Sequence, residues 1–119
     1  NDIYVNENTA YVATKYGISS IRLNDNNFGD TYYIGDAGEF SSVLQCTVIN
    51  NYIYAATELF GLKRISITNP NLIDYAQWET YSHAKWLSIV NLKGSLVGVK
   101  DHFSLNIILI QKQVDLILH

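Results

Sequence analysis

The sequence predicts an all-β fold, a partial β-propeller built from a repeated unit of about 43 residues. Strand-like runs rich in Tyr, Val, Ile and Thr alternate with short polar turns along the chain. The pattern around Tyr11 recurs around Tyr54 and again around Val97, each time after 43 residues. Each complete unit holds four short runs. A period of about 40–45 residues with four strands is typical of a propeller blade.

The length of the chain limits how much of a propeller it can form. The 119 residues hold about 2.5–3 four-stranded antiparallel blades, which start near residues 2, 45 and 88. Propellers close with about 4–8 blades, because each blade needs a neighbour on both of its faces. The predicted ring is therefore open. We expect chains to associate with one another through the open blade edges.

The first blade contains four expected strands. They lie at residues 2–6, 10–14, 18–23 and 31–34. The second strand has apolar residues on both faces, as in a strand that is covered on both sides. Gly17 provides the turn before the third strand, and the Asn-, Asp- and Gly-rich residues 24–30 are expected to form a loop.

The second blade repeats this order with one extra residue in the turn between its second and third strands. Its expected strands lie at residues 42–49, 52–57, 62–67 and 77–81. Residues 72–76 are expected to form a single helical turn before the outer strand. A third unit begins with strands at 86–92 and 95–99, and we place the boundary of the partial propeller at residues 1–100.

The segment 101–119 departs from the repeat. It lacks Gly and Pro, and it carries the apolar run 105–110 where the repeat requires a turn and a glycine. A buried strand, a helix and sequence foreign to the parent gene are all compatible with this apolar tail, and we favour a non-native or truncated end. The chain begins at Asn1 without a signal peptide, so we expect a processed product or an excised fragment.

Charge and hydropathy exclude two classes of partner. The net charge is −3 and the eight Lys and Arg residues are scattered, whereas nucleic-acid binding requires clustered cations. The adjacent Lys63 and Arg64 are expected at a solvated strand edge. No run of about 18 apolar residues is present, so no transmembrane segment is expected.

No group of residues has the pattern of a catalytic or metal site. Cys46 alternates with apolar residues and is expected to be a buried, unreactive thiol. His83, His102 and His119 show no ligand spacing. The segments 25–30 and 35–39 contain carboxylates, but they are expected to be polar turns rather than calcium or phosphate sites. We therefore expect a protein that is not an enzyme, with no catalytic residue, cofactor or metal.

Aromatic residues are the remaining candidates for a binding role. Seven of them fall on strands or beside turns: Tyr11, Tyr16, Tyr52, Tyr54, Phe60, Trp78 and Trp86. At strand spacing, aromatic side chains usually pack between blades. Tyr16 and Phe60 lie next to turns, and they are the residues that we expect to contact a ligand or partner.

Several segments also resemble a known family. They are the runs 31–40 and 48–58, the pair Gly61-Leu62 and the motif 69–72 (Asn-Pro-Asn-Leu). These residues are similar to the N-terminal β-propeller of PorZ-like proteins of the type IX secretion system of Bacteroidetes. The resemblance covers about residues 1–100. The periplasmic propellers of hybrid two-component regulators form a broader related group.

The resemblance implies a non-enzymatic binding or scaffold module of a cell-envelope protein. Such proteins contain two propellers, a further β-domain and a C-terminal sorting domain, and they belong to an attachment complex at the cell surface. The implied location is the periplasm or the cell surface. The implied partners are proteins of the secretion machinery or anionic lipopolysaccharide. The alternative is a ligand-sensing propeller of a hybrid two-component regulator.

Overall fold

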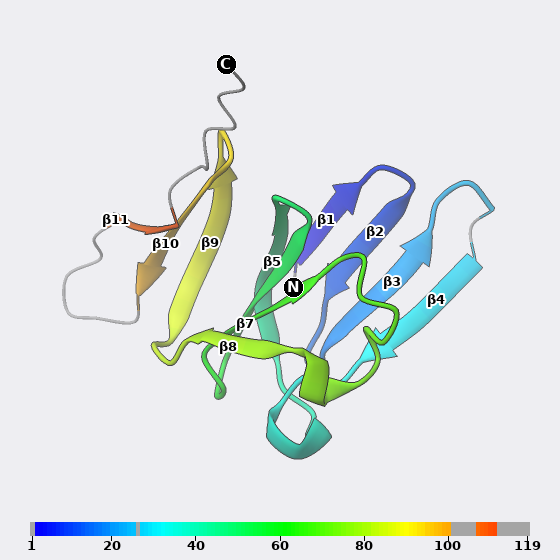
Figure 1. Ribbon diagram of the computed structural model, residues 1–119, viewed down its shortest axis with the longest axis horizontal. Helices are drawn as coiled ribbons and strands as arrows, with labels where there is room; N and C mark the ends of the chain where they lie inside the picture. The colour runs from blue at the N-terminus through cyan, green and yellow to red at the C-terminus, as the bar shows by residue number, and fades with distance from the viewer. Residues whose placement is uncertain (1, 26, 101–106, 112–119) are drawn as a thin grey trace.

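The computed structural model describes residues 2–25, 27–100 and 107–111, which form three antiparallel sheets (Figure 1). The described elements are strands and two short 3-10 helices. The prediction of an all-β partial propeller is confirmed. None of the helices in these residues is long and apolar enough to span a membrane.

The first sheet contains four strands in chain order. They are β1 (Asp2–Asn6), β2 (Thr9–Ala13), β3 (Ile18–Arg22) and β4 (Asn27–Tyr32). The expected loop at 24–30 is wrong for residues 27–30, which belong to β4. The Asp30 amide donates to Ser20 Oγ, and a Cβ on Gly29 would lie 2.3 Å from that oxygen. The close contact of Gly29 and Asp30 with Ser20 on β3 therefore stabilises a strand here, although the composition of the segment favours a turn.

The second sheet has the same order and follows the 3-10 helix η1 (Asp36–Gly38). Its strands are β5 (Val43–Ile49), β6 (Tyr52–Thr57), β7 (Leu62–Ser66) and β8 (Glu79–Ser82). The helical turn expected at 72–76 is the 3-10 helix η2 (Tyr75–Gln77). The Asp74 side chain caps η2 by accepting from the Ala76 amide, which sets the start of the helix.

The third sheet contains three strands in the described residues. They are β9 (Trp86–Leu92), β10 (Ser95–Lys100) and β11 (Ile107–Gln111), with β10 in the centre. Residues 107–110 of the apolar run 105–110 belong to the strand β11, and Leu109 in it is exposed. The non-native or truncated end stays a prediction. Residues 101–106 and 112–119, which include His102 and His119, lie outside the described residues.

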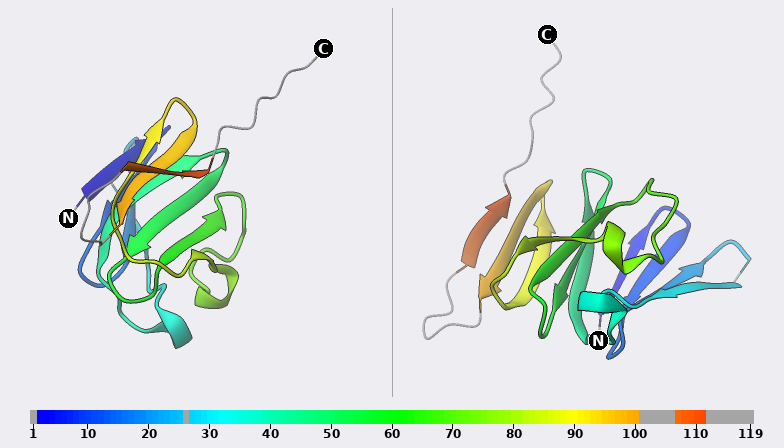
Figure 2. Two further views of the ribbon diagram at one scale, coloured as in Figure 1. Left: turned by 90° about the vertical axis from the view of Figure 1, so that its left-hand side faces the viewer. Right: turned by 60° about the horizontal axis from the view of Figure 1, so that its bottom comes forward.

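The three sheets fan out from their first strands. β5 contacts both β1 and β9, so the inner strands of all three sheets lie side by side. The first and third sheets extend to opposite sides of the second in two different views (Figures 1 and 2). This arrangement is that of consecutive blades around a propeller axis.

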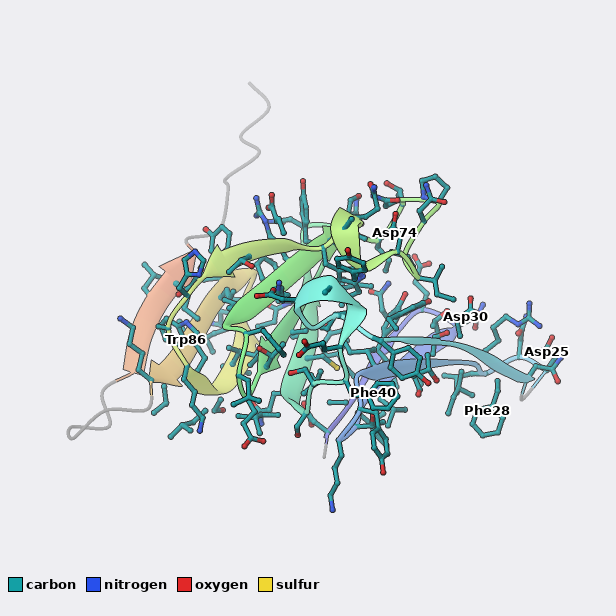
Figure 3. All side chains as sticks on the ribbon, turned by 90° about the horizontal axis from the view of Figure 1, so that it is seen from below. Asp25, Phe28, Asp30, Phe40, Asp74 and Trp86 are labelled. Atoms are coloured by element: carbon teal, nitrogen blue, oxygen red, sulfur yellow. The ribbon has the colours of Figure 1, made fainter. Side chains whose placement is uncertain are left out.

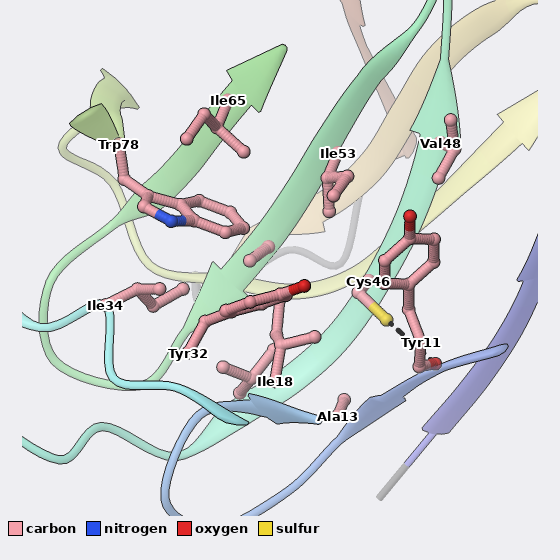
Figure 4. Packing of buried hydrophobic residues seen from close by; sticks show 12 residues of the cluster. Tyr11, Ala13, Ile18, Tyr32, Ile34, Cys46, Val48, Ile53, Ile65 and Trp78 are labelled. Atoms are coloured by element: carbon pink, nitrogen blue, oxygen red, sulfur yellow. Dashed lines mark hydrogen bonds between the residues drawn. The ribbon is translucent and has the colours of Figure 1, made fainter. Parts of the chain in front are cut away.

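A first apolar core joins the first two sheets (Figure 4). The first sheet contributes Tyr11, Ala13, Ile18 and Tyr32, and the second contributes Cys46, Val48, Ile53, Ala55 and Ile65. The Cys46 thiol donates to the Tyr11 carbonyl oxygen at 3.6 Å. Burial raises the pKa of this thiol to about 12. Cys46 is therefore a buried thiol, as predicted.

A second apolar core joins the second and third sheets. The second sheet contributes Ile49, Tyr54, Ala56 and Leu62, and the third contributes Trp86, Ile89 and Leu96. Gln45 adds a polar link, because its Oε1 accepts from Ser88 Oγ at 2.8 Å and from the Ile89 amide at 2.7 Å. The strand residues Tyr11, Tyr54 and Trp86 and the residue before β8, Trp78, are buried in the two cores, as predicted for aromatic residues that pack between blades.

The expectation that Lys63 and Arg64 lie at a solvated edge is wrong. Lys63 is buried, and its Nζ lies 2.9 Å from Asp36 Oδ1. Arg64 pairs with Glu79, and its guanidinium carbon lies 4.5 Å from the ring centroids of both Tyr52 and Tyr81. β7 is an interior strand between β6 and β8, so its cations find partners on neighbouring segments.

Candidate functional site

Two hairpin tips and one connection between sheets meet at the same end of the molecule, which we call the rim. It consists of the β2–β3 tip (14–17), the connection 33–42 and the β6–β7 tip (58–61). The Ser41 amide donates to the Tyr16 carbonyl at 3.2 Å, and the Glu58 amide donates to the Ser42 carbonyl at 2.9 Å. The connection is therefore held between the two tips by backbone hydrogen bonds.

A threonine shapes each tip in the same way. Thr14 Oγ1 accepts from the Tyr16 and Gly17 amides and donates to the Gly17 carbonyl. In the next blade, Thr57 Oγ1 accepts from the Phe60 amide at 2.9 Å and donates to the Gly61 carbonyl. The two aromatic residues chosen from sequence thus occupy equivalent positions, immediately before the glycine of each tip.

Three exposed aromatic side chains, Tyr16, Tyr33 and Phe40, form a contiguous group that we call the rim cluster. The Phe40 ring lies 5.7 Å from Tyr16 in an edge-on arrangement and 4.8 Å from Tyr33. Tyr16 is 59% exposed and Phe40 is 64% exposed, and Phe40 lies at the surface in Figure 3. Burial of aromatic rings is favourable, so the exposed ring surface of this group is available to a partner. The two tyrosines also carry phenol hydroxyls that can form hydrogen bonds.

Phe60 has a different environment from Tyr16. It is half-buried, and a Cβ on Gly35 would lie 2.8 Å from Phe60 Cε2. The ring therefore covers the backbone of the connection between the sheets. The structure brings Tyr16 into the rim cluster and places Phe60 against the base of the connection.

Sequence reasoning missed Tyr33 and Phe40. Tyr33 falls in the strand expected at 31–34, whereas β4 ends at Tyr32. Phe40 lies between the expected strands, where no alternating pattern marks a side chain as exposed or buried. A topological signal was present. In a four-stranded meander, the connection to the next blade leaves from the same end as the tip between the second and third strands. Aromatic residues in these two segments are therefore expected to be neighbours.

A second candidate is a groove of about 510 Å³ along the inner strands β1, β5 and β9. Its polar lining includes Asp2, Gln45, Thr47, Ser88 and Asn91. Gln45 and Asn91 are used for links between sheets, since Asn91 Nδ2 donates to the Val48 carbonyl. Thr47 Oγ1 has no hydrogen-bond partner within the described part of the chain. Gln45, Ser88 and Asn91 of this groove are thus already used in hydrogen bonds between sheets.

The remaining titratable candidates do not gather at either location. His83 is exposed, and Asp36 is engaged by Lys63. Within residues 2–25, 27–100 and 107–111, no three His, Cys, Asp or Glu side chains are grouped closely enough to hold a metal ion. The rim cluster is the most developed site that these residues form.

The fold and the rim define a class of protein: an open β-propeller segment with an aromatic surface on the end that carries the blade connections. The model of the family described as the N-terminal β-propeller domain of PorZ, of the type IX secretion system, matches residues 1–79. The chain belongs to this family, and the resemblance seen in the sequence is confirmed. No curated protein matches the chain.

Proposed function

We propose that this chain is a non-enzymatic binding or scaffold module of a cell-envelope component of the type IX secretion system. It acts in the periplasm or at the cell surface. The observation that carries the proposal is the exposed rim cluster of Tyr16, Tyr33 and Phe40. Membership in the PorZ propeller family supports the assignment to the secretion system.

The setting of the rim cluster suits a docking surface. Its rings stand on segments that are fixed by backbone hydrogen bonds between the tips and the connection. Little conformational entropy is therefore lost when a partner covers them. Large, rigid aromatic side chains are also the residue type that contributes most to binding at protein interfaces.

Charge favours a protein partner over anionic lipopolysaccharide at this surface. The exposed charged residues of the rim segments are Lys15, Asp36, Glu39 and Glu58, so the rim has no excess of positive charge. The whole chain carries a net charge of −3. A polyanion would be repelled, whereas an apolar or weakly basic protein surface would be complementary. The partner in this proposal is a protein of the secretion machinery or its cargo.

The test is a binding titration with the double variant Tyr16→Ser/Phe40→Ser. The probes are a purified type IX cargo protein that retains its C-terminal sorting domain, and vesicles that contain anionic lipopolysaccharide. We expect the unaltered chain to bind the cargo, and the double variant to bind it about 30-fold more weakly, as at interface hot spots. The matched control is Phe28→Ser, an exposed aromatic residue at the far end of the first sheet (Figure 3).

Three results would overturn the proposal. The first is no cargo binding by the unaltered chain. The second is an equal loss of affinity in the Phe28→Ser control, which would mean that the cluster has no special role. The third is binding to the lipopolysaccharide vesicles alone, which would replace a protein partner with a glycolipid.

A further inference from the structure

The outer strands of the first two sheets carry the same three-residue motif. It is Asp-Thr-Tyr at residues 30–32 in β4 and Glu-Thr-Tyr at residues 79–81 in β8. The threonine of the motif pairs with Ser19 in the first sheet and with Lys63 in the second. Ser19 and Lys63 are equivalent, because each is the second residue of its strand. The register of the motif against the third strand is therefore the same in both blades.

The next residue of the third strand differs between the two blades. It is Ser20 in β3 and Arg64 in β7. Each of them pairs with an equivalent tyrosine of the second strand, Tyr11 in the first blade and Tyr54 in the second. The first blade thus has two tyrosines and a carboxylate at the same positions as the second blade, with a serine in place of the arginine.

In the second blade, the arginine is the centre of this group of side chains. Arg64 pairs with the Glu79 carboxylate, and its Nη1 donates to the Tyr54 hydroxyl at 3.1 Å. Its guanidinium carbon also lies 4.5 Å from the centroid of the Tyr81 ring. The guanidinium therefore uses a carboxylate, a phenol oxygen and an aromatic ring of the group.

In the first blade, the same place is a groove of about 460 Å³ between the first two sheets. Its lining includes Tyr11, Ser20, Asp30 and Tyr32 of the first sheet, and Leu72 from the connection between β7 and β8. The corresponding groove of the second blade, which the arginine helps to line, is about 230 Å³. Both sheets that bound the larger groove have four strands. We call it the first-blade groove.

The charges of the first-blade groove favour a cation. Asp30 is exposed (Figure 3), and the serine across from it cannot neutralise its carboxylate. Arg22 also lines the groove, but its Nη2 lies 3.8 Å from the Asp25 carboxylate, which offsets its charge. The Tyr32 hydroxyl donates to Ser20 Oγ at 3.4 Å, so the lone pairs of the phenol oxygen remain as acceptors.

We infer that the first-blade groove binds the guanidinium of an arginine side chain on a partner protein, in the place that Arg64 fills in the second blade. The Asp30 carboxylate pairs with this group, and the Tyr11 and Tyr32 hydroxyls accept hydrogen bonds from it. A guanidinium has five donors in a planar fork, so it can reach a carboxylate and phenol oxygens together, which an ammonium cannot. The groove shares no residue with the rim cluster, and the inference does not rest on the proposed function.

The test is an NMR titration of the isotope-labelled full chain with N-acetyl-arginine methylamide in about 0.15 M salt. We expect a dissociation constant of about 1–10 mM, as for one solvent-accessible charged group. The expected shifts are at the amides of Ser20, Gly29 and Asp30. Two matched probes are N-acetyl-citrulline methylamide, which has the shape without the charge, and N-acetyl-lysine methylamide, which has the charge without the fork. Both are expected to bind at least about fivefold more weakly.

Three variants identify the groups that bind the probe. Asp30→Asn removes the carboxylate and is expected to weaken binding about tenfold, as for a charge-assisted hydrogen bond. Tyr11→Phe removes one acceptor and is expected to weaken binding about threefold. Ser20→Arg supplies a guanidinium from the chain itself and is expected to abolish binding. The matched control Glu58→Gln removes a carboxylate from the rim and is expected to bind the probe unchanged.

Circular dichroism checks that each variant is folded, and Asp30→Asn with Tyr11→Phe decides the question if Ser20→Arg is not. The inference is wrong if the arginine probe leaves the three amides unshifted, or if the citrulline or lysine probe binds equally well. Equal affinities of Asp30→Asn and Glu58→Gln would also overturn it. The rim variant Tyr16→Ser/Phe40→Ser is expected to bind the probe unchanged. Loss of cargo binding and loss of arginine binding therefore report on separate surfaces.

Discussion

Lys63 Nζ lies 2.9 Å from Asp36 Oδ1, and this ion pair ties the middle sheet to the connection that precedes it. The Lys63 side chain is only 7% exposed, whereas the Asp36 side chain is largely in solvent. Asp36 belongs to η1, which forms part of the rim connection. The pair therefore fixes the segment that carries Tyr33 and Phe40 to the rigid β7 strand.

We predict that Asp36→Asn lowers the free energy of unfolding by about 1–2 kcal/mol, because the buried Lys63 ammonium loses its charged partner. The value lies below that of a fully buried pair, since Asp36 itself remains hydrated. Urea unfolding of the single variant measures the loss. In the double variant Asp36→Asn/Lys63→Met most of the stability is expected to return, and an additive loss would contradict the role of the pair.

Arg64 is the second cation whose chemistry depends on its surroundings. Its guanidinium stacks against Tyr52 and Tyr81, and its Nη1 donates to the Tyr54 hydroxyl at 3.1 Å. We predict that Arg64→Lys lowers the free energy of unfolding by about 1 kcal/mol, because an ammonium cannot stack and donate in these directions together.

Thermal or urea unfolding measures the effect of Arg64→Lys. The matched control is Arg22→Lys at an exposed ion pair with Asp25, for which we expect a change below about 0.5 kcal/mol. Equal effects of the two substitutions would show that the aromatic contacts of Arg64 contribute nothing to stability.

The Cys46 thiol is predicted to be unreactive in the folded chain. Burial raises its pKa to about 12, with a smaller contribution from the Asp2 carboxylate, so almost no thiolate is present at pH 8. A disulfide reagent added at pH 8 is expected to label the native chain only as fast as the first two sheets separate. The urea-unfolded chain provides the control and reacts at once. Rapid labelling without urea would contradict the sealed interface.

Stability is predicted to fall at alkaline pH. Burial raises the pKa of Tyr11 from 10.0 to about 12, and it raises the pKa of Cys46 from 9.0 to about 12. Both groups stay neutral in the folded chain while they ionise in the unfolded chain. Their contribution is therefore complete below about pH 9 and is lost progressively between about pH 9 and 12. Urea titrations across this range measure the slope, and Tyr11→Phe is expected to reduce it. An unchanged slope in this variant would contradict the assignment.

Gly61 is predicted to tolerate no side chain. Its φ is +78°, and a Cβ would lie 2.3 Å from the Ser82 carbonyl oxygen on the neighbouring strand segment. We expect Gly61→Ala to lower the free energy of unfolding by about 2 kcal/mol or more. Glu58→Ala changes an exposed residue of the same tip and is expected to have little effect. A neutral Gly61→Ala would show that the tip relaxes freely.

The repeat of 43 residues could be predicted because each blade has the same order of alternating apolar runs and turn residues. Such local patterns are visible in the sequence itself. The positions of β5, β6, β9 and β10 follow from alternating apolar residues bounded by turns. The start of β4 was missed because its pairing depends on a distant residue, Ser20, rather than on its own composition. The environment of Lys63 was missed for the same reason, since its partner lies 27 residues away.

The candidate site was only partly predictable. Tyr16 was identified because the glycine after it marks a hairpin tip. The clustering of Tyr33 and Phe40 with it depends on how one blade connects to the next, which only the topology supplies.

The middle sheet is the one sheet among the described residues that is covered by a neighbour on each side. Its strand β6 is buried along the whole run from Ile53 to Thr57. In hydrogen exchange, the amides of β6 should therefore be the last to take up deuterium, and the outer strands β4 and β11 should be the first. Deuterium uptake would therefore proceed from the outer strands of the first and third sheets to the middle sheet.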